Sequence, residues 1–294
     1  MIVTNKKKNT LLGYLFFMPF GILFGLFKVY PFIKSIILGF NKWNMFQPPE
    51  FVSFDNYFTL FTTDRFWESL WHTIYFTILT VPFLVIFGFL VAVLLNSRIK
   101  NVGFFRAGFY IPYILSISVI SLTWKLMYNE TFGIVNKILS VFGVQSINWL
   151  NDPVFAMPAV AFATIWWTLG FNIIIYLSAI QQIPTSLYEA ATLDGANAFQ
   201  RLTKITVPLL KRTHILVIVL QIIYSLQIFG QVYIMTGGGP GGKTRTLIQY
   251  IYETGFKHFK MGYAQAIAKV FFLLMVGVAV VQVKLMSKRG DSYE

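Results

Sequence analysis

One segment of the chain has the residue types and spacing of a phosphate-binding loop. Gly237-Gly-Gly-Pro-Gly-Gly242-Lys243-Thr244 satisfies the P-loop pattern, in which backbone amides and a lysine hold nucleotide phosphates. Such a loop needs a buried strand before it and a helix after it, whose N-terminus holds phosphate. The residues before Gly237 instead form an apolar run of membrane length. We therefore interpret the segment as a sharp chain reversal, in which glycines permit positive φ and Pro240 fixes the exit.

The other reactive residue types do not fall into a catalytic or metal-binding pattern. The chain has no cysteine, which excludes disulfides, thiolate metal ligands and cysteine nucleophiles. His72, His214 and His258 lie at the ends of apolar runs, and no two have metal-ligand spacing. Paired carboxylates and an activated serine, which an intramembrane enzyme would need, are not seen within these runs. We expect a chain that is not an enzyme, with no catalytic residue, no metal and no bound cofactor.

Three apolar runs carry aromatic rings together with hydroxyl or amide groups at helical spacing. Such mixed faces suit a sugar, because its C–H face stacks on rings and its hydroxyl groups need hydrogen bonds. The middle thirds of these runs hold no charge, which favours a neutral solute. Each ring could equally fill the core of a helix bundle. The candidates are Tyr113, Ile117 and Ser121 in the first run, Thr164, Trp167, Thr168 and Phe171 in the second, and Gln221, Tyr224, Ser225 and Ile228 in the third.

The composition indicates which elements position these faces. The 294 residues are 56% hydrophobic and only 12% charged, far from the balance of a soluble domain. A helical membrane crossing needs roughly 20 mostly apolar residues, whereas barrel strands alternate apolar and polar positions. We predict an all-α integral membrane protein with one transmembrane domain over residues 1–294. Its six predicted spans cover residues 11–40, 73–95, 107–126, 156–180, 215–235 and 262–285.

The distribution of Lys and Arg predicts the orientation, since cytoplasmic helix ends are enriched in them. With the N-terminus inside, the outer segments hold most of the acidic residues. The inner segments then hold Lys6, Lys7, Lys8, Arg98, Lys100, Arg106, Arg201, Lys204, Lys211, Arg212, Lys284, Lys288 and Arg289. Both termini are therefore expected in the cytoplasm, with the chain passing repeatedly through a membrane among its lipids. The net charge of +13 is a topology signal, and we expect no nucleic-acid partner.

Two features leave alternatives open. The outer segments 40–70 and 128–155 are rich in Trp, Phe, Asn and Pro, and they either meet a protein partner or anchor the chain at the headgroup level. Lys269 lies well inside the last predicted span. It either reaches the outer surface along its flexible stem or pairs with a phosphate or carboxylate on the solute.

The inner segment 184–208 predicts a helix-turn-helix. Ser186 and Glu189 have capping-box spacing and would open the first helix, which Asp194-Gly195 would end. Asn197 with Gln200 would start the second helix, and Pro208 would lie in the first turn of span five. Ala190 and Ala191 give the first helix a small-residue surface. The small surface allows close approach to a partner.

The segment Glu189-Ala-Ala-Thr-Leu-Asp-Gly195-Ala-Asn-Ala-Phe-Gln-Arg-Leu-Thr-Lys-Ile205-Thr-Val-Pro208-Leu-Leu resembles the EAA loop of binding-protein-dependent ABC importer permeases. That pattern has Glu-Ala-Ala, a Gly six residues after the Glu, and an Ile-x-x-Pro-Leu close. The glycine stretch from Thr236 to Pro240 makes the chain similar to the maltose and oligosaccharide branch of this family.

The resemblance implies the remaining expectations, including the plasma (inner) membrane of a bacterial cell as the location. The loop would couple the permease to a cytoplasmic ABC ATPase through Glu189, Ala190, Ala191, Asp194, Gly195, Ile205 and Pro208. The expected partners are a second, homologous permease, two copies of the ATPase, which would bind ATP and Mg²⁺, and an extracellular or periplasmic solute-binding protein. The expected cargo is a carbohydrate, with a glycerol-phosphate-type or other small polar solute as the alternative.

Overall fold

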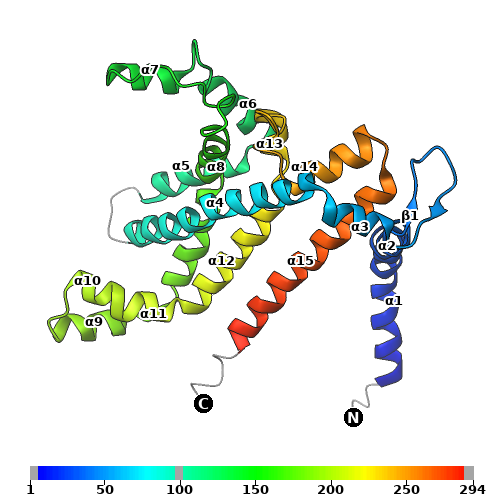
Figure 1. Ribbon diagram of the computed structural model, residues 1–294. Coiled ribbons are helices and arrows are strands. Elements are labelled where there is room, and N and C mark those ends of the chain that lie inside the picture. The colour runs from blue at the N-terminus through cyan, green and yellow to red at the C-terminus, as the bar shows by residue number, and fades with distance from the viewer. Residues whose placement is uncertain (1–5, 97–101, 288–294) are drawn as a thin grey trace. The chain divides into compact units, whose positions relative to one another are not determined.

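The structure is a computed structural model that describes residues 6–96 and 102–287. The chain is mostly helical and separates into two compact units. One unit comprises Asp64–Tyr250 with Leu273–Glu294, and the other comprises Met1–Thr63 with Ile251–Phe272. The long helix α15 (Met261–Ser287) contributes to both (Figure 1).

The larger unit is built on long apolar helices that pack against one another. Helix α4 (Asp64–Asn96) packs against α8 (Ala156–Ile180) and α12 (Lys211–Leu226), and α5 (Val102–Ile114) packs against α8. Around them lie α6 (Ile117–Met127), α7 (Ile134–Val141), α9 (Thr185–Leu193), α10 (Ala198–Arg201), the π-helix η2 (Leu202–Thr206), α11 (Val207–Leu209), α13 (Gly230–Met235) and α14 (Leu247–Tyr252).

Small residues set the closest helix crossings. A Cβ on Gly88 would lie 2.8 Å from the Cβ of Asn172, and a Cβ on Gly170 would overlap the backbone carbonyl of Phe109. These glycines let α4 and α5 approach α8 closely. Lipid chains are as apolar as the helices, so helix association in a bilayer depends on such packing and on interhelical hydrogen bonds rather than on hydrophobic burial.

Buried polar groups also link the three central helices. The Gln221 side chain of α12 donates to Asn172 Oδ1 of α8 at 2.9 Å, and Tyr176 Oη of α8 lies 3.0 Å from His214 Nδ1 of α12. The hydroxyl of Ser225 on α12 lies 2.9 Å from that of Thr80 on α4. Unpaired polar atoms are costly in a low-dielectric interior, and each of these bonds gives a partner to the two atoms that it joins.

Two spans predicted as single helices are interrupted. Residues 107–126 fall into α5 and α6, which meet at a 99° bend. Ser116 caps α6 by accepting a hydrogen bond from the Val119 amide. Residues 215–235 fall into α12 and α13, separated by Gln227–Phe229. The expectation of continuous helices is therefore wrong at these two places, because a capping serine and a local break end the helical hydrogen bonding.

The glycine segment after α13 is a tight, internally bonded loop. Gly237, Gly238, Gly241 and Gly242 have positive φ. The fully buried Thr244 hydroxyl donates to the Gly239 carbonyl at 2.6 Å and lies 2.7 Å from the Thr236 hydroxyl. The element before the loop is helix α13 and not a strand, and the Thr244 hydroxyl is bonded within the loop. The geometry is that of a chain reversal, as predicted, and not of a nucleotide-binding P-loop.

The smaller unit contains α1 (Lys6–Phe24), the π-helix η1 (Gly25–Val29) and α2 (Tyr30–Leu38), followed by the two-stranded sheet of β1 (Asn41–Lys42) and β2 (Glu50–Phe51), α3 (Asp55–Thr62) and the π-helix η3 (Glu253–Lys257). The Asn56 side chain ties the turn after α2 by donating to the carbonyls of Gly39 and Asn41. Lys269 Nζ donates to the Ser35 hydroxyl and lies 5.0 Å from the ring centre of Phe32.

Four stretches of the described chain are long and apolar enough to cross a membrane, namely Leu12–Leu38, Asp64–Asn96, Ala156–Ile180 and Met261–Val281. Two bent pairs, α5 with α6 and Ala198–Leu209 with α12, raise the number to six if each pair is one span. The structure thus supports four to six crossings where the sequence predicts six. Of the charges used to predict orientation, Arg98, Lys100, Lys288 and Arg289 lie outside the described residues.

Candidate functional site

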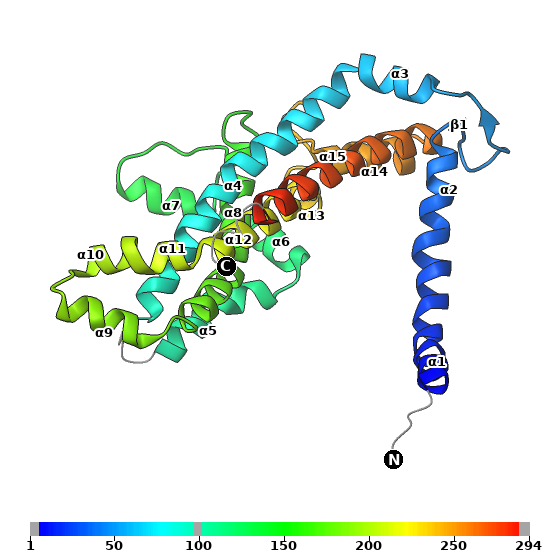
Figure 2. The ribbon, with the colours of Figure 1, turned by 90° about the horizontal axis from the view of Figure 1, so that it is seen from below.

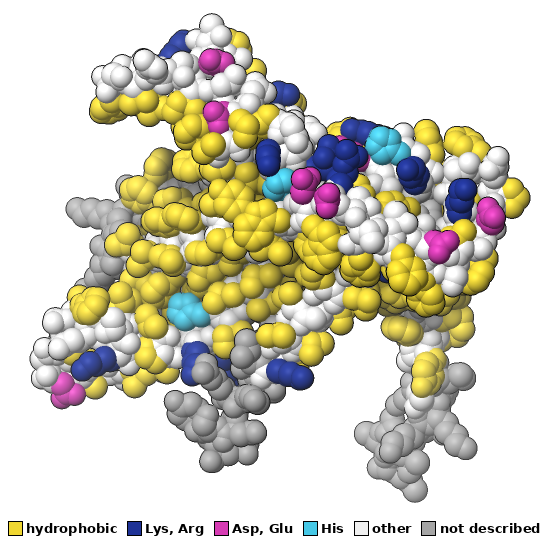
Figure 3. Space-filling view, in the orientation of Figure 1, with side chains coloured by type: hydrophobic (Ala, Val, Ile, Leu, Met, Phe, Trp, Pro, Cys, Tyr) yellow, Lys and Arg dark blue, Asp and Glu magenta, His cyan; other side chains and the backbone are white. Residues whose placement is uncertain are grey.

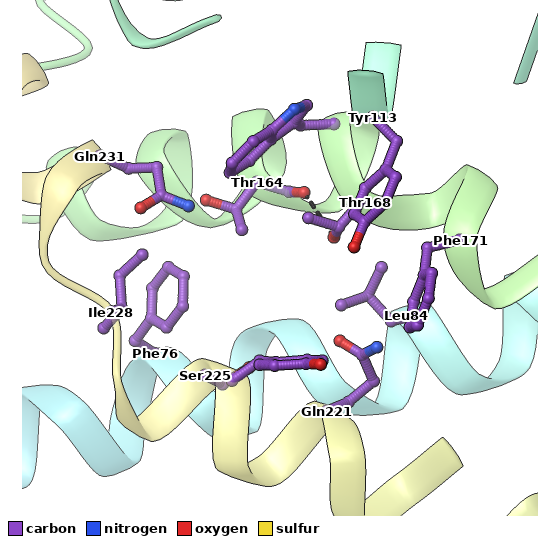
Figure 4. Close-up of a pocket in the computed structure, with 12 residues that line it drawn as sticks. Phe76, Leu84, Tyr113, Thr164, Thr168, Phe171, Gln221, Ser225, Ile228 and Gln231 are labelled. Atoms are coloured by element: carbon purple, nitrogen blue, oxygen red, sulfur yellow. Dashed lines mark hydrogen bonds between the residues drawn. The ribbon is translucent and has the colours of Figure 1, made fainter. Parts of the chain in front are cut away.

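A cavity of about 260 Å³ lies between α4, α8 and α12, with one ring contributed by α5 and one amide by α13. Figure 4 shows Thr164 and Thr168 of α8 facing Gln221 and Ser225 of α12 across the open space. The twelve lining residues are Phe76, Leu84, Tyr113, Thr164, Trp167, Thr168, Phe171, Gln221, Tyr224, Ser225, Ile228 and Gln231. None of these lining residues is charged.

The wall contains a run of stacked rings. Tyr113 and Phe171 stack with ring centres 5.1 Å apart and planes at 20°, and Tyr224 meets Phe171 edge-on at 6.5 Å. The Trp167 indole is fixed beside them, because its Nε1 donates to the Leu115 carbonyl at 3.3 Å. A flat apolar surface of this kind can stack against the C–H face of a ring-shaped solute.

Hydrogen-bonding groups lie opposite and beside the rings. The hydroxyls of Thr164 and Thr168 donate to carbonyls one turn back, at 2.9 and 2.8 Å, which leaves their oxygen lone pairs as acceptors toward the cavity. The Gln221 amide keeps its oxygen as an acceptor after its nitrogen is bonded to Asn172. The Gln231 side chain points into the same space (Figure 4). The cavity thus offers neutral hydrogen-bonding partners.

The structure brings together eight of the residues singled out from sequence, Tyr113, Thr164, Trp167, Thr168, Phe171, Gln221, Tyr224 and Ser225, and Ile228 lies with them. The expectation that Ile117 and Ser121 share a face with Tyr113 is wrong, because the bend between α5 and α6 carries them away. Ser121 is fully buried, its hydroxyl has no hydrogen-bond partner among the described residues, and Ile117 packs against Gly230.

Three lining residues were not predicted. Phe76 and Leu84 lie on α4, which was not among the three runs singled out, and Gln231 lies beyond the break in span five. Their spacing offered one signal. Phe76, Thr80 and Leu84 follow one another at four-residue intervals and are all buried, so they share one face of α4.

The second candidate site is the hairpin formed by α9 and the α10–η2–α11 segment. Figures 1 and 2 show α9 and α10 side by side. Two side-chain bonds join the arms: Tyr188 Oη lies 2.9 Å from the Thr206 hydroxyl, and Arg201 donates to the Thr192 hydroxyl at 2.6 Å. These cross-links make the hairpin one stiff element.

The turn of the hairpin agrees with its sequence. Gly195 has φ of +78°, and the Ala196 amide returns to the Ala191 carbonyl at 2.8 Å, which closes the end of α9. Asn197 and Gln200 form the predicted capping box, with the two reciprocal bonds at 2.9 and 2.8 Å. This part of the local prediction is confirmed.

Two local predictions in the hairpin are wrong. Helix α9 begins at Thr185 after Pro184 and has no side-chain cap, so Ser186 already lies inside the helix and cannot bond to Glu189 as a capping box. Pro208 belongs to α11, and α12 begins only at Lys211 after a 68° bend, so Pro208 is not in the first turn of span five. The bend falls at the buried Leu210.

The surface of the hairpin has features of an unoccupied contact area. Glu189, Ala190, Asp194, Gly195 and Pro208 are exposed, while Ala191 and Ile205 are half-buried. The Glu189 carboxylate forms neither a hydrogen bond nor an ion pair with the described residues. Leu193 and Phe199 at the tip are 89% and 71% exposed. A shallow, mostly apolar hollow lies beside them, lined by Thr185, Tyr188, Glu189, Thr192 and Leu193.

Residues 59–289 match the family described as the binding-protein-dependent transport system inner membrane component. The match covers most of the chain, and the chain belongs to this family. It is therefore an inner-membrane component of a transport system, with the fold of an ABC transporter permease.

Individual relatives agree with this assignment. The chain is 35% identical over 279 residues to the sulfoquinovosyl glycerol transport system permease protein of Agrobacterium fabrum, covering 94% of this chain and 91% of the relative. It is 35% identical over 287 residues to the trehalose/maltose transport system permease protein of Thermococcus litoralis, covering 97% of both. Among solved structures, a chain of a bacterial ABC transporter involved in the import of the acidic polysaccharide alginate matches with a TM-score of 0.84 and 25% identity, over 99% of this chain and 100% of that chain.

Proposed function

We propose that this chain is a permease subunit of an ATP-driven, binding-protein-dependent importer, and that its cargo is a neutral carbohydrate. The assignment of the cargo rests on the cavity between α4, α8 and α12, whose lining combines stacked rings with uncharged hydrogen-bonding groups. The relatives named above for sulfoquinovosyl glycerol and for trehalose/maltose transport support a carbohydrate. The chain itself would bind no cofactor and carry out no bond-breaking chemistry.

The proposed membrane arrangement has six spans with both termini in the cytoplasm of a bacterial cell. The third crossing is then α5 with α6, and the fifth is α12 with α13, which together cover the predicted span 215–235. Non-helical backbone at membrane depth is tolerated where it is buried in protein or lines a cavity. The break before α13 fits this rule, because Ile228 within it and Gln231 just after it line the cavity. The hairpin of α9 to α11 lies on the cytoplasmic side in this arrangement.

We further propose that the hairpin is the contact with the ATPase. Exposed Leu193 and Phe199 supply apolar area for burial, and the unengaged Glu189 carboxylate can form a charge-assisted bond with a cation on the partner. The two bonds between its arms would let it transmit force as one body. The assembly would contain a second homologous permease, two ATPase subunits that bind ATP and Mg²⁺, and an external solute-binding protein.

No structural feature of the described residues favours the glycerol-phosphate-type alternative. Lys269, the residue that kept it open, donates to the Ser35 hydroxyl and lies over the Phe32 ring. The lining of the cavity offers no cation to an anionic solute.

Transport by the assembled complex tests the cargo proposal. Trp167→Ala, Tyr224→Ala and Ser225→Ala are expected to lower the uptake of a sugar from the cognate binding protein into proteoliposomes. A neutral hydrogen bond is worth about 1 kcal/mol, so Ser225→Ala should cost roughly fivefold. Trp71→Ala, an exposed tryptophan on α4 outside the cavity, is the matched control. Unchanged transport and substrate preference in all three cavity variants would refute the proposed site.

A further inference from the structure

Helix α7 has an apolar face that the rest of the described chain leaves uncovered. Ile134, Ile138, Val141 and Phe142 follow the spacing of one helical face and are all exposed, Val141 by 82% and Phe142 by 78%. Phe132 and Val144, on either side of the helix, are exposed as well. An eight-residue helix does not form by itself in water, so something must hold α7 in place.

The opposite, polar face shows what holds it. Asn136 is buried, and its side chain makes four hydrogen bonds: its Nδ2 donates to the carbonyls of Glu130 and Ile147, and its Oδ1 accepts from the Ile147 amide and the Trp149 indole. Trp149 in turn packs against Tyr128, with ring centres 5.6 Å apart. These contacts hold α7 to the rest of the chain through its polar side, which leaves its apolar side facing outward.

The uncovered face continues the hydrophobic surface of the membrane helices. Figure 3 shows hydrophobic side chains along the edge of the α7 segment that faces the hydrophobic surface of the same unit. The segment joins α6 to α8, both of which belong to candidate membrane spans. The exposed Ser140 lies away from this edge by helical spacing, and Lys137 lies at its border, one turn before Val141.

We infer that α7 is an interfacial membrane helix, with Ile134, Ile138, Val141 and Phe142 buried in the boundary between headgroups and acyl chains of the outer leaflet. A helix with one apolar and one polar face lies in the plane of the interface, its apolar side about 5–10 Å into that boundary. Phenylalanine and valine side chains on this face gain by leaving water, and Lys137 remains among the headgroups. In this arrangement α7 fixes the depth of the loop between α6 and α8 against the lipid surface.

Site-directed fluorescence tests the inference, and the chain suits it because it has no native cysteine. Ile138→Cys and Val141→Cys place an NBD label on the apolar face, and Ser140→Cys is the matched control on the polar face. Each full-length variant is reconstituted in nanodiscs containing phosphatidylcholine brominated on its acyl chains. Emission is measured with and without brominated lipid, and again with iodide in the buffer.

The apolar-face labels should show blue-shifted emission, lose intensity with brominated lipid and resist iodide. The polar-face label should show the reverse. Equal quenching of both faces by iodide would overturn the inference, because α7 would then lie in water. Resistance of the apolar-face labels to both quenchers would also overturn it, because a protein surface would then cover the face. Circular dichroism and gel filtration of each variant establish that the fold is retained.

Discussion

Substitutions of Gly195 can distinguish the effect of backbone strain in the hairpin from the effect of added bulk at its contact with a partner. Its φ of +78° is a conformation that costs an ordinary L-residue about 1–2 kcal/mol, whereas asparagine adopts it more readily. A Cβ at this position meets no atom within 4 Å. Substitution here therefore strains the backbone without an internal clash, and any bulk that is added projects outward.

Three variants use this difference. Gly195→Asn keeps the backbone conformation, Gly195→Ala adds only the backbone strain, and Gly195→Trp adds the same strain together with a large side chain. If the tip of the hairpin sits in a close-fitting surface of the ATPase, the tryptophan should cost a further 1–3 kcal/mol, or about 5–150-fold in productive coupling. The asparagine and alanine variants should stay close to the wild type.

The assay is transport and ATP hydrolysis measured on the same proteoliposomes, with the binding protein and its solute present or absent. We expect Gly195→Trp to lose transport while hydrolysis persists and no longer responds to the loaded binding protein. Wild-type coupling by Gly195→Trp would refute the proposed contact. A loss in Gly195→Ala as large as in Gly195→Trp would assign the effect to backbone strain and would equally refute a steric role at the interface.

Two further predictions concern the helix interfaces. Gly170→Leu should destabilise the purified protein by about 1–3 kcal/mol, because the new side chain meets the Phe109 carbonyl. Gly108→Leu, at an open position on α5, is the control and should not destabilise it. Equal melting temperatures of the two variants by fluorescence-detected gel filtration would contradict this prediction. Gln221→Leu should lower the free energy of unfolding by about 0.6–1.7 kcal/mol, because Asn172 loses its hydrogen-bond partner. The double variant with Asn172→Leu should lose less than the sum of the two single variants. Strictly additive losses would show that the bond contributes nothing to stability.

The cavity could be predicted where its helices run without a break. Thr164, Trp167, Thr168 and Phe171 lie on α8, which covers 156–180 without interruption, so a period of 3.6 residues groups them correctly. The same reasoning failed for Ser121, because hydrophobicity continues through Ser116 while the helix does not. An N-capping serine inside an apolar run is a local signal that periodicity cannot register.

Other features depend on tertiary contacts that a single sequence does not specify. Gln231, which lies beyond the break in span five, reaches the cavity only because α13 packs against α6 and α8. The turn of the hairpin was predictable because Gly195 and the Asn197–Gln200 pair act within a few residues. The start of α9 was not, since Pro184 rather than Ser186 determines it.

The polar links between α4, α8 and α12 limit how this chain can change the access of a solute. Asn172 and Tyr176 on α8 are bonded to Gln221 and His214 on α12, at levels separated by about one turn of α8, and Ser225 ties α12 to α4. Separating these helices would break several buried bonds at once. Helices α4, α8 and α12 should therefore move together as one rigid body when the hairpin moves. A gate for the solute would then open beside this group of helices, and not by separating them.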